Sequence, residues 1–88
     1  MRERDIEKYL AKRVKALGGT CRKAMWIGAR GCPDRMVLLP GRTPIFVELK
    51  APGQKLQPHQ QREHQRLLDA GVAVVVIDSL EGVDKLCQ

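Results

Sequence analysis

Apolar side chains near the start of the chain recur at the spacing of a helix. Four of them lie three or four positions apart, at Ile6, Leu10, Val14 and Leu17. Lysines occupy the opposite face, and the pair Gly18-Gly19 interrupts the pattern as is usual at the end of a helix. The pattern predicts an amphipathic helix over residues 3–17.

Apolar stretches bounded by turn residues predict strands after this helix. They cover residues 20–27, 36–39 and 45–50. The segment Pro40 to Pro44 has turn composition, so the second and third strands are expected to form an antiparallel hairpin. Residues 72–77 are apolar at every position, which predicts a strand buried on both faces.

Two further helices complete the predicted order of elements. Ala51-Pro52-Gly53 ends the third strand, and Pro58 suits the first turn of a helix that runs to about Ala70. A short closing helix is predicted over residues 80–86. The order α-β-β-β-α-β-α predicts an α/β fold with a mixed sheet flanked by helices. Without repeats or a linker, residues 1–88 are expected to form one domain.

Composition favours a soluble intracellular protein. Three cysteines without a Cys-x-x-Cys pair provide neither a disulfide framework nor a zinc signature, and suit a reducing cytosol. The charged start Arg2-Glu3-Arg4-Asp5 makes a signal peptide unexpected, and the longest apolar run is too short to span a bilayer. We expect no membrane association. Because so short a chain buries little surface, dimerisation would add useful stability.

The charge balance favours a polyanionic partner. Sixteen Lys and Arg residues against ten acids give a net charge of +6, and nucleic acid is the commonest such partner. Aromatic residues make up only 3%, which favours recognition of duplex or branched DNA by shape and backbone over base stacking on single strands. Trp26 either stacks on a base or packs in the core or a dimer contact. The candidate phosphate-binding cations are Lys8, Lys12, Lys15, Arg22, Lys23, Arg30 and Arg35.

Two short sequence motifs contain the candidate catalytic residues. Gly31-Cys32-Pro33-Asp34-Arg35 precedes one predicted strand, and Val47-Glu48-Leu49-Lys50 ends the next. The carboxylates of Asp34 and Glu48, with the Leu49 carbonyl, are the hard oxygen ligands that Mg²⁺ prefers. Lys50 would act as a cation near a water or phosphate. Each motif alone is better explained as a turn or an exposed strand end, and only the two together favour a metal site.

The register of the hairpin decides whether these two carboxylates meet. If the turn centres on Gly41, Asp34 lies opposite Glu48 on the same face. A slip of half a residue puts them on opposite faces. A positive φ at Gly41 would suit the odd-length loop that the first register needs. The metal hypothesis therefore predicts the first register, unless Asp34 precedes the regular pairing.

Three further residues are candidates for the same site. On the second predicted helix, Gln60 and His64 share a face with Leu67 and Gly71, so both lie toward the sheet or remain on the surface. For His64, simple packing near the sheet is at least as well supported as a role in the site. Glu7 borders the apolar stripe of the first helix, where it would orient a water or complete a ligand set.

Taken together, the motifs resemble the VRR-NUC domain of the PD-(D/E)xK nuclease superfamily. The resemblance extends from about Glu7 to Leu80 and includes the string Leu56-x-Pro58-x-Gln60 and the closing Ala70-Gly71-Val72. One departure is Gln57, where a serine, a better helix cap, often stands.

The resemblance implies a restriction-endonuclease-like fold and a Mg²⁺- or Mn²⁺-dependent endonuclease, with no organic cofactor. It makes Asp34 and Glu48 metal ligands, Lys50 catalytic, Gln60 the active-site glutamine and Glu7 a site residue. Stand-alone members imply a homodimer that acts on branched DNA such as four-way (Holliday) junctions, in the cytoplasm of a bacterium or phage-infected cell. The alternative is a non-catalytic DNA-binding module on the same fold.

Overall fold

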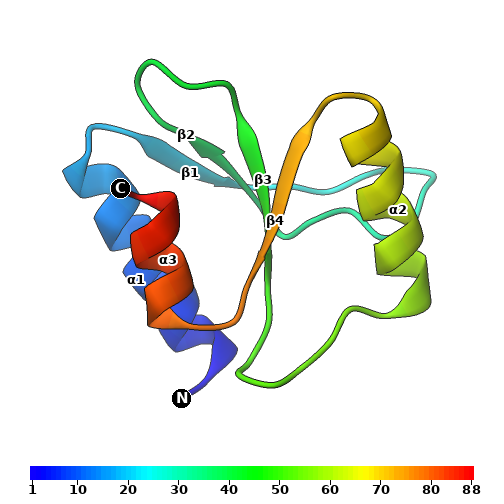
Figure 1. The fold of residues 1–88 in the computed structure, drawn as a ribbon, viewed down its shortest axis with the longest axis horizontal. Coiled ribbons are helices and arrows are strands. Elements are labelled where there is room, and N and C mark those ends of the chain that lie inside the picture. Colours follow the sequence, from blue (N-terminus) through cyan, green and yellow to red (C-terminus); the bar gives the residue numbers. More distant parts are fainter.

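Helices cover both faces of a four-stranded sheet (Figure 1). The computed structural model describes residues 1–88. Its elements are α1 (Glu3–Ala16), β1 (Thr20–Lys23), β2 (Arg35–Leu38), β3 (Ile45–Leu49), α2 (Pro58–Asp69), β4 (Ala73–Ile77) and α3 (Leu80–Leu86). This order, and the α/β class, are those that the sequence predicts. None of the three helices is long and apolar enough to cross a membrane.

The sheet has the strand order β1-β2-β3-β4. β1 pairs with β2 and β2 with β3 in antiparallel fashion, whereas β3 pairs with β4 in parallel, with α2 as the crossover. Parallel strands need such a long connection, while the antiparallel pair β2–β3 needs only the turn around Gly41. Gly41 has a φ of +76°, the left-handed conformation that glycine adopts without strain.

The β2–β3 hairpin has the register that the metal hypothesis requires. Arg35 lies opposite Val47 and Met36 opposite Phe46, so the turn centres on Gly41. Continuing this register by one residue, just before β2 begins, places Asp34 opposite Glu48. The two motifs that contain Asp34 and Glu48 therefore lie side by side at one end of the hairpin.

The two outer strands differ from the prediction. β1 ends at Lys23, and residues 24–27 belong to the loop that leads to β2, because only residues 20–23 pair with β2. β4, predicted from its continuous apolar run to be buried on both faces, is an edge strand. Its Val76 is 45% exposed. β-branched residues favour strand structure both at the edge and in the middle of a sheet. The apolar run therefore does not predict where in the sheet the strand lies.

The core lies on one face of the sheet, between the strands and the pair α1 and α3. Ile6, Leu10 and Val14 of α1 are fully buried, as the helical spacing requires. They meet the sheet residues Val37, Val47, Leu49 and Ile77, together with Val83 of α3. The opposite face of the sheet, under α2, carries the polar side chains of the site.

Candidate active site

The loop before β2 positions Asp34 by close packing against α2. Gly31 has a φ of +89°, and a Cβ at this position would lie 2.6 Å from the His59 carbonyl oxygen. Only glycine therefore allows the loop to approach this closely. Pro33 is buried, and the backbone N–H of Leu49 donates a 2.8 Å hydrogen bond to the Asp34 Oδ2. This bond fixes the Asp34 carboxylate beside the end of β3.

Glu48 is a carboxylate in an almost fully buried position. The residue is 2% exposed, and its Oε2 accepts a 3.1 Å hydrogen bond from the Gln60 Nε2. Its Oε1 is buried and has no hydrogen-bond partner. Burial and, to a smaller extent, the nearby charge of Asp34 raise the pKa of Glu48 to about 7, against the opposing effect of Lys50. The site therefore disfavours the negative charge unless a cation compensates it.

Gln60 joins Lys50 to Glu48 across the gap between β3 and α2. The Lys50 Nζ donates a 3.0 Å hydrogen bond to the Gln60 Oε1, and lies 3.7 Å from the Glu48 Oε2. The same Gln60 oxygen accepts a hydrogen bond from the Gln57 backbone N–H at the start of α2. One side chain thus closes the first turn of the helix and orients both charged groups of the Glu48-x-Lys50 motif.

His64 lies on the other side of the Glu48 carboxylate. Its Nε2 is 3.8 Å from the Glu48 Oε1, which is too long for a hydrogen bond. Both ring nitrogens are buried without a partner, and burial lowers the pKa of His64. The helical spacing from Gln60 indicates the inward face of α2, but the sequence does not place the imidazole beside Glu48.

Glu7 reaches the site from α1. It pairs with Arg35, one residue beyond Asp34. A surface cavity of about 330 Å³ brings these residues together, with walls formed by Glu3, Glu7, Lys23, Ala24, Asp34 and Arg35. The sequence-predicted acids thus converge on one end of the hairpin, although Glu7 already has a cationic partner there.

The donor set suits a hard divalent cation. Asp34 and Glu48 offer carboxylate oxygens, one of which is a buried atom with no partner, and burial together with the charge of Asp34 raises the pKa of Glu48. No three His, Cys, Asp or Glu side chains are arranged to hold a metal by themselves. A cation here would therefore take the rest of its ligands from water, a phosphate or a backbone carbonyl, as Mg²⁺ commonly does.

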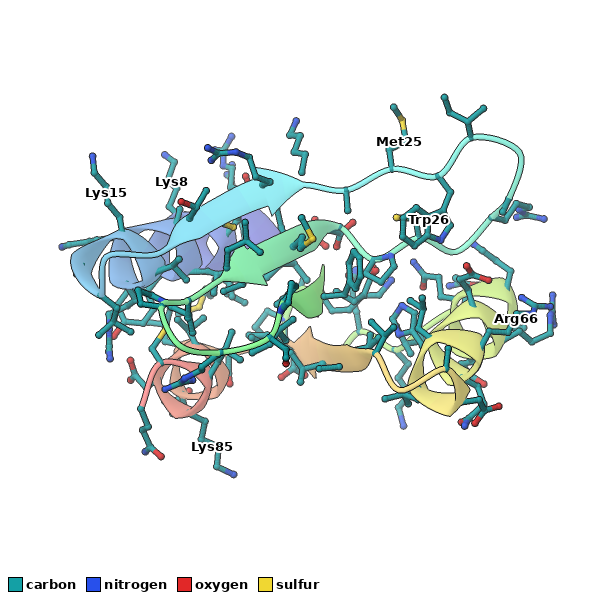
Figure 2. All side chains as sticks on the ribbon, turned by 90° about the horizontal axis from the view of Figure 1, so that it is seen from above. Lys8, Lys15, Met25, Trp26, Arg66 and Lys85 are labelled. Carbon is teal, nitrogen blue, oxygen red and sulfur yellow. The ribbon has the colours of Figure 1, made fainter.

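The predicted DNA-binding cations lie on α1, on β1, in the following loop and at the start of β2. Most are exposed, whereas the Arg35 side chain is 14% exposed and paired with Glu7. Figure 2 shows Lys8 and Lys15 projecting on the same side of the molecule, and Lys85 on the opposite side. Trp26 turns inward: its indole N–H donates a 2.7 Å hydrogen bond to Glu63 of α2.

Comparisons with known proteins agree with this geometry. The family model of the VRR-NUC domain matches residues 2–81. A protein of Acyrthosiphon pisum secondary endosymbiont phage 1, named "Putative nuclease p44", is 51% identical over 79 residues, which cover 90% of this chain and 85% of that protein. A solved structure described as a VRR_NUC domain matches with a TM-score of 0.87 and 44% identity, over 96% of this chain and 91% of the other. The chain therefore belongs to the VRR-NUC family of nuclease domains.

Proposed function

We propose that this protein is a DNA endonuclease that depends on Mg²⁺ or Mn²⁺. The observation that carries the proposal is the hairpin register, which puts Asp34 opposite Glu48, with Lys50 and Gln60 bonded beside them. An acid pair with one unpartnered buried oxygen supports a cation as the missing partner. The family assignment supports phosphodiester hydrolysis as the reaction.

Each residue of the proposed site has a distinct task. Asp34 and Glu48 would hold the cation, which supplies a Lewis acid that offsets charge on the phosphate and makes a water more nucleophilic. The Leu49 backbone N–H holds the Asp34 carboxylate in place. Gln60 holds the Glu48 carboxylate and the Lys50 ammonium in position through its two hydrogen bonds. Lys50 would then face the phosphate or the attacking water as a cation. Glu7 would orient a water or contribute a ligand from the α1 side.

We further propose that two copies act together on branched DNA such as a four-way junction. The resemblance to stand-alone members of the family supports this arrangement. A two-fold dimer would present two equivalent sites to a substrate that is itself symmetric. The net charge of +6 supports binding to the phosphate backbone rather than to particular bases.

The test uses labelled duplex, flap and four-way-junction DNA with Mg²⁺, Mn²⁺ or EDTA. We expect metal-dependent cleavage that is lost in Glu48→Gln and Lys50→Ala and retained in Glu81→Gln, which changes an exposed acid on α3. Binding of every substrate without cutting, in wild type and variants alike, would contradict the proposal and support a non-catalytic binding module. A monomeric mass at micromolar concentration would contradict the two-copy arrangement.

A further inference from the structure

The loop between β1 and β2 exposes two large apolar side chains. Met25 is 81% exposed and Ile27 is 97% exposed, the two highest values among the large apolar residues. They flank Trp26, which turns inward. Trp26, the residue considered for base stacking, is therefore hydrogen-bonded to Glu63, and its neighbours Met25 and Ile27 project into solvent.

Contacts on either side hold this loop in place. The Trp26 indole is hydrogen-bonded to Glu63 and its ring meets Phe46 edge-on, with 5.6 Å between the ring centroids. Further along, the Gly31 backbone packs against α2. A loop anchored by an aromatic side chain presents its neighbouring residues with little loss of conformational entropy on binding. Met25 and Ile27 are thus held outward by the packing of Trp26.

The surroundings of these two side chains are basic and lead to the active site. In Figure 2, Met25 projects on the same side of the molecule as Lys8 and Lys15. The residues just before Met25, Lys23 and Ala24, line the cavity that reaches Asp34. Apolar side chains bordered by cations suit DNA, which offers phosphates at its edges and apolar base faces where stacking is disturbed.

We propose that Met25 and Ile27 contact base faces of the DNA at a distorted or unpaired step, while the flanking cations hold its backbone. The inference rests on the proposed function, because it takes DNA as the substrate, and it adds the part of the protein that recognises a branch point. Apolar side chains inserted at a base step are a recurrent way of engaging deformed DNA. The flanking positive charge is complementary to the phosphates of DNA.

Binding of the double variant Met25→Ser/Ile27→Ser to a four-way junction tests the inference. The junction carries 2-aminopurine at the branch point, and EDTA prevents cleavage. We expect the affinity measured by fluorescence anisotropy to fall about tenfold or more, a loss of about 1.4 kcal/mol. The 2-aminopurine signal that the wild type induces should disappear. The matched control is Leu68→Gln, which removes a 48% exposed leucine from α2 and should bind like the wild type.

Salt dependence and oligomeric mass separate this contact from other effects. The Met25→Ser/Ile27→Ser variant should leave the slope of log affinity against log salt concentration unchanged. The Lys8→Ala/Lys15→Ala variant should make this slope shallower, by the amount expected for the loss of about two phosphate contacts. An affinity loss smaller than tenfold would overturn the inference. So would a change in oligomeric mass in the Met25→Ser/Ile27→Ser protein, because the loop would then contact a second copy.

This binding experiment, together with the cleavage test of the proposed function, distinguishes the inference from the proposed function. Wild-type protein that cleaves junctions while the double variant binds normally would overturn the inference and leave the nuclease proposal intact. Binding that depends on Met25 and Ile27, without metal-dependent cleavage, would overturn the nuclease proposal and support the DNA contact.

Discussion

The two faces of the sheet bury side chains of opposite character, and β3 contributes to both. Val47 and Leu49 point toward α1 and α3, where every neighbour in the core is apolar. Glu48, between them, points toward α2 and is buried to nearly the same extent, at 2% exposed against 0% and 1%. One face therefore excludes water around hydrocarbon, and the other excludes water around a carboxylate and an imidazole.

The difference indicates how the fold divides stability from chemistry. Buried apolar area is the main favourable contribution to folding. A buried acid without a full set of partners opposes it. The stabilisation from apolar burial on the α1–α3 face therefore has to exceed the free-energy cost of burying Glu48 on the α2 face. Binding of a cation would offset that cost. Substitutions on neighbouring positions of β3 should separate the two contributions.

The largest expected effect is on cleavage when Glu48 is replaced. Glu48→Gln keeps the shape of the side chain and removes one ligand charge, so the cleavage rate should fall about a thousandfold, equivalent to about 4 kcal/mol. Initial rates on junction DNA in Mg²⁺ measure it. Glu81→Gln should cleave at the wild-type rate. A Glu48→Gln protein that cleaves within tenfold of wild type would show that the α2 face does not carry the chemistry.

The next largest effect is on folding when Leu49 is replaced. Leu49→Ala leaves a cavity in the core and should lower the free energy of unfolding by about 3 kcal/mol. Urea denaturation in EDTA measures it. Leu68→Ala, at a 48% exposed position, should change the same quantity by much less. Equal losses for the two leucines would contradict the assignment of the core to the α1–α3 face.

A pH dependence of folding should arise from Glu48 in the absence of metal. Its pKa is raised from 4.5 to about 7, so the folded protein retains a proton that the unfolded chain releases. The contribution of Glu48 to stability is present in full below pH 4.5, and up to about 3 kcal/mol is lost as pH rises through 7. The charges that act on Glu48 are those of Asp34, Lys50 and Glu3, and the imidazole of His64 lies 3.8 Å away.

The measurement compares thermal unfolding of wild type and Glu48→Gln between pH 4.5 and 8 in EDTA. The variant lacks only the carboxyl group of Glu48, so the difference between the two curves reports the ionisation of Glu48. The wild type should lose stability relative to the variant as pH rises. Parallel curves across this range would show that the Glu48 charge is compensated in the metal-free protein.

The smallest expected effect is a gain in stability when His64 is replaced. His64→Leu removes two buried nitrogens that lack partners, and should raise the free energy of unfolding by about 1 kcal/mol. Cleavage should stay within tenfold of the wild-type rate, because no hydrogen bond joins the imidazole to Glu48. His59→Leu, on the same helix, is the control. A loss of stability in His64→Leu would indicate that the imidazole is bonded in solution.

Local features made most of the fold predictable. The helical spacing of Ile6, Leu10 and Val14 identifies both the helix and its buried face. The turn composition around Gly41 predicts the β2–β3 hairpin but is compatible with two registers. The register in which Asp34 meets Glu48 was the one that the metal hypothesis required, and the structure has it. The prediction that β4 is buried on both faces was wrong, because β4 lies at the edge of the sheet and its Val76 is exposed. Its apolar pattern reports a preference for strand structure but contains no information about which strands flank it.

The sequence by itself determined the order of elements and indicated the acids, the lysine and the glutamine of the candidate site. It left open two registers of β2 against β3, between which the structure decided. Only the tertiary structure decided that His64 faces Glu48, that Glu7 pairs with Arg35, and that Trp26 turns inward while Met25 remains exposed. Helical periodicity and hairpin register are local geometric constraints. The other contacts depend on how α1, α2 and the β1–β2 loop pack across the sheet, and no short stretch of sequence specifies that packing.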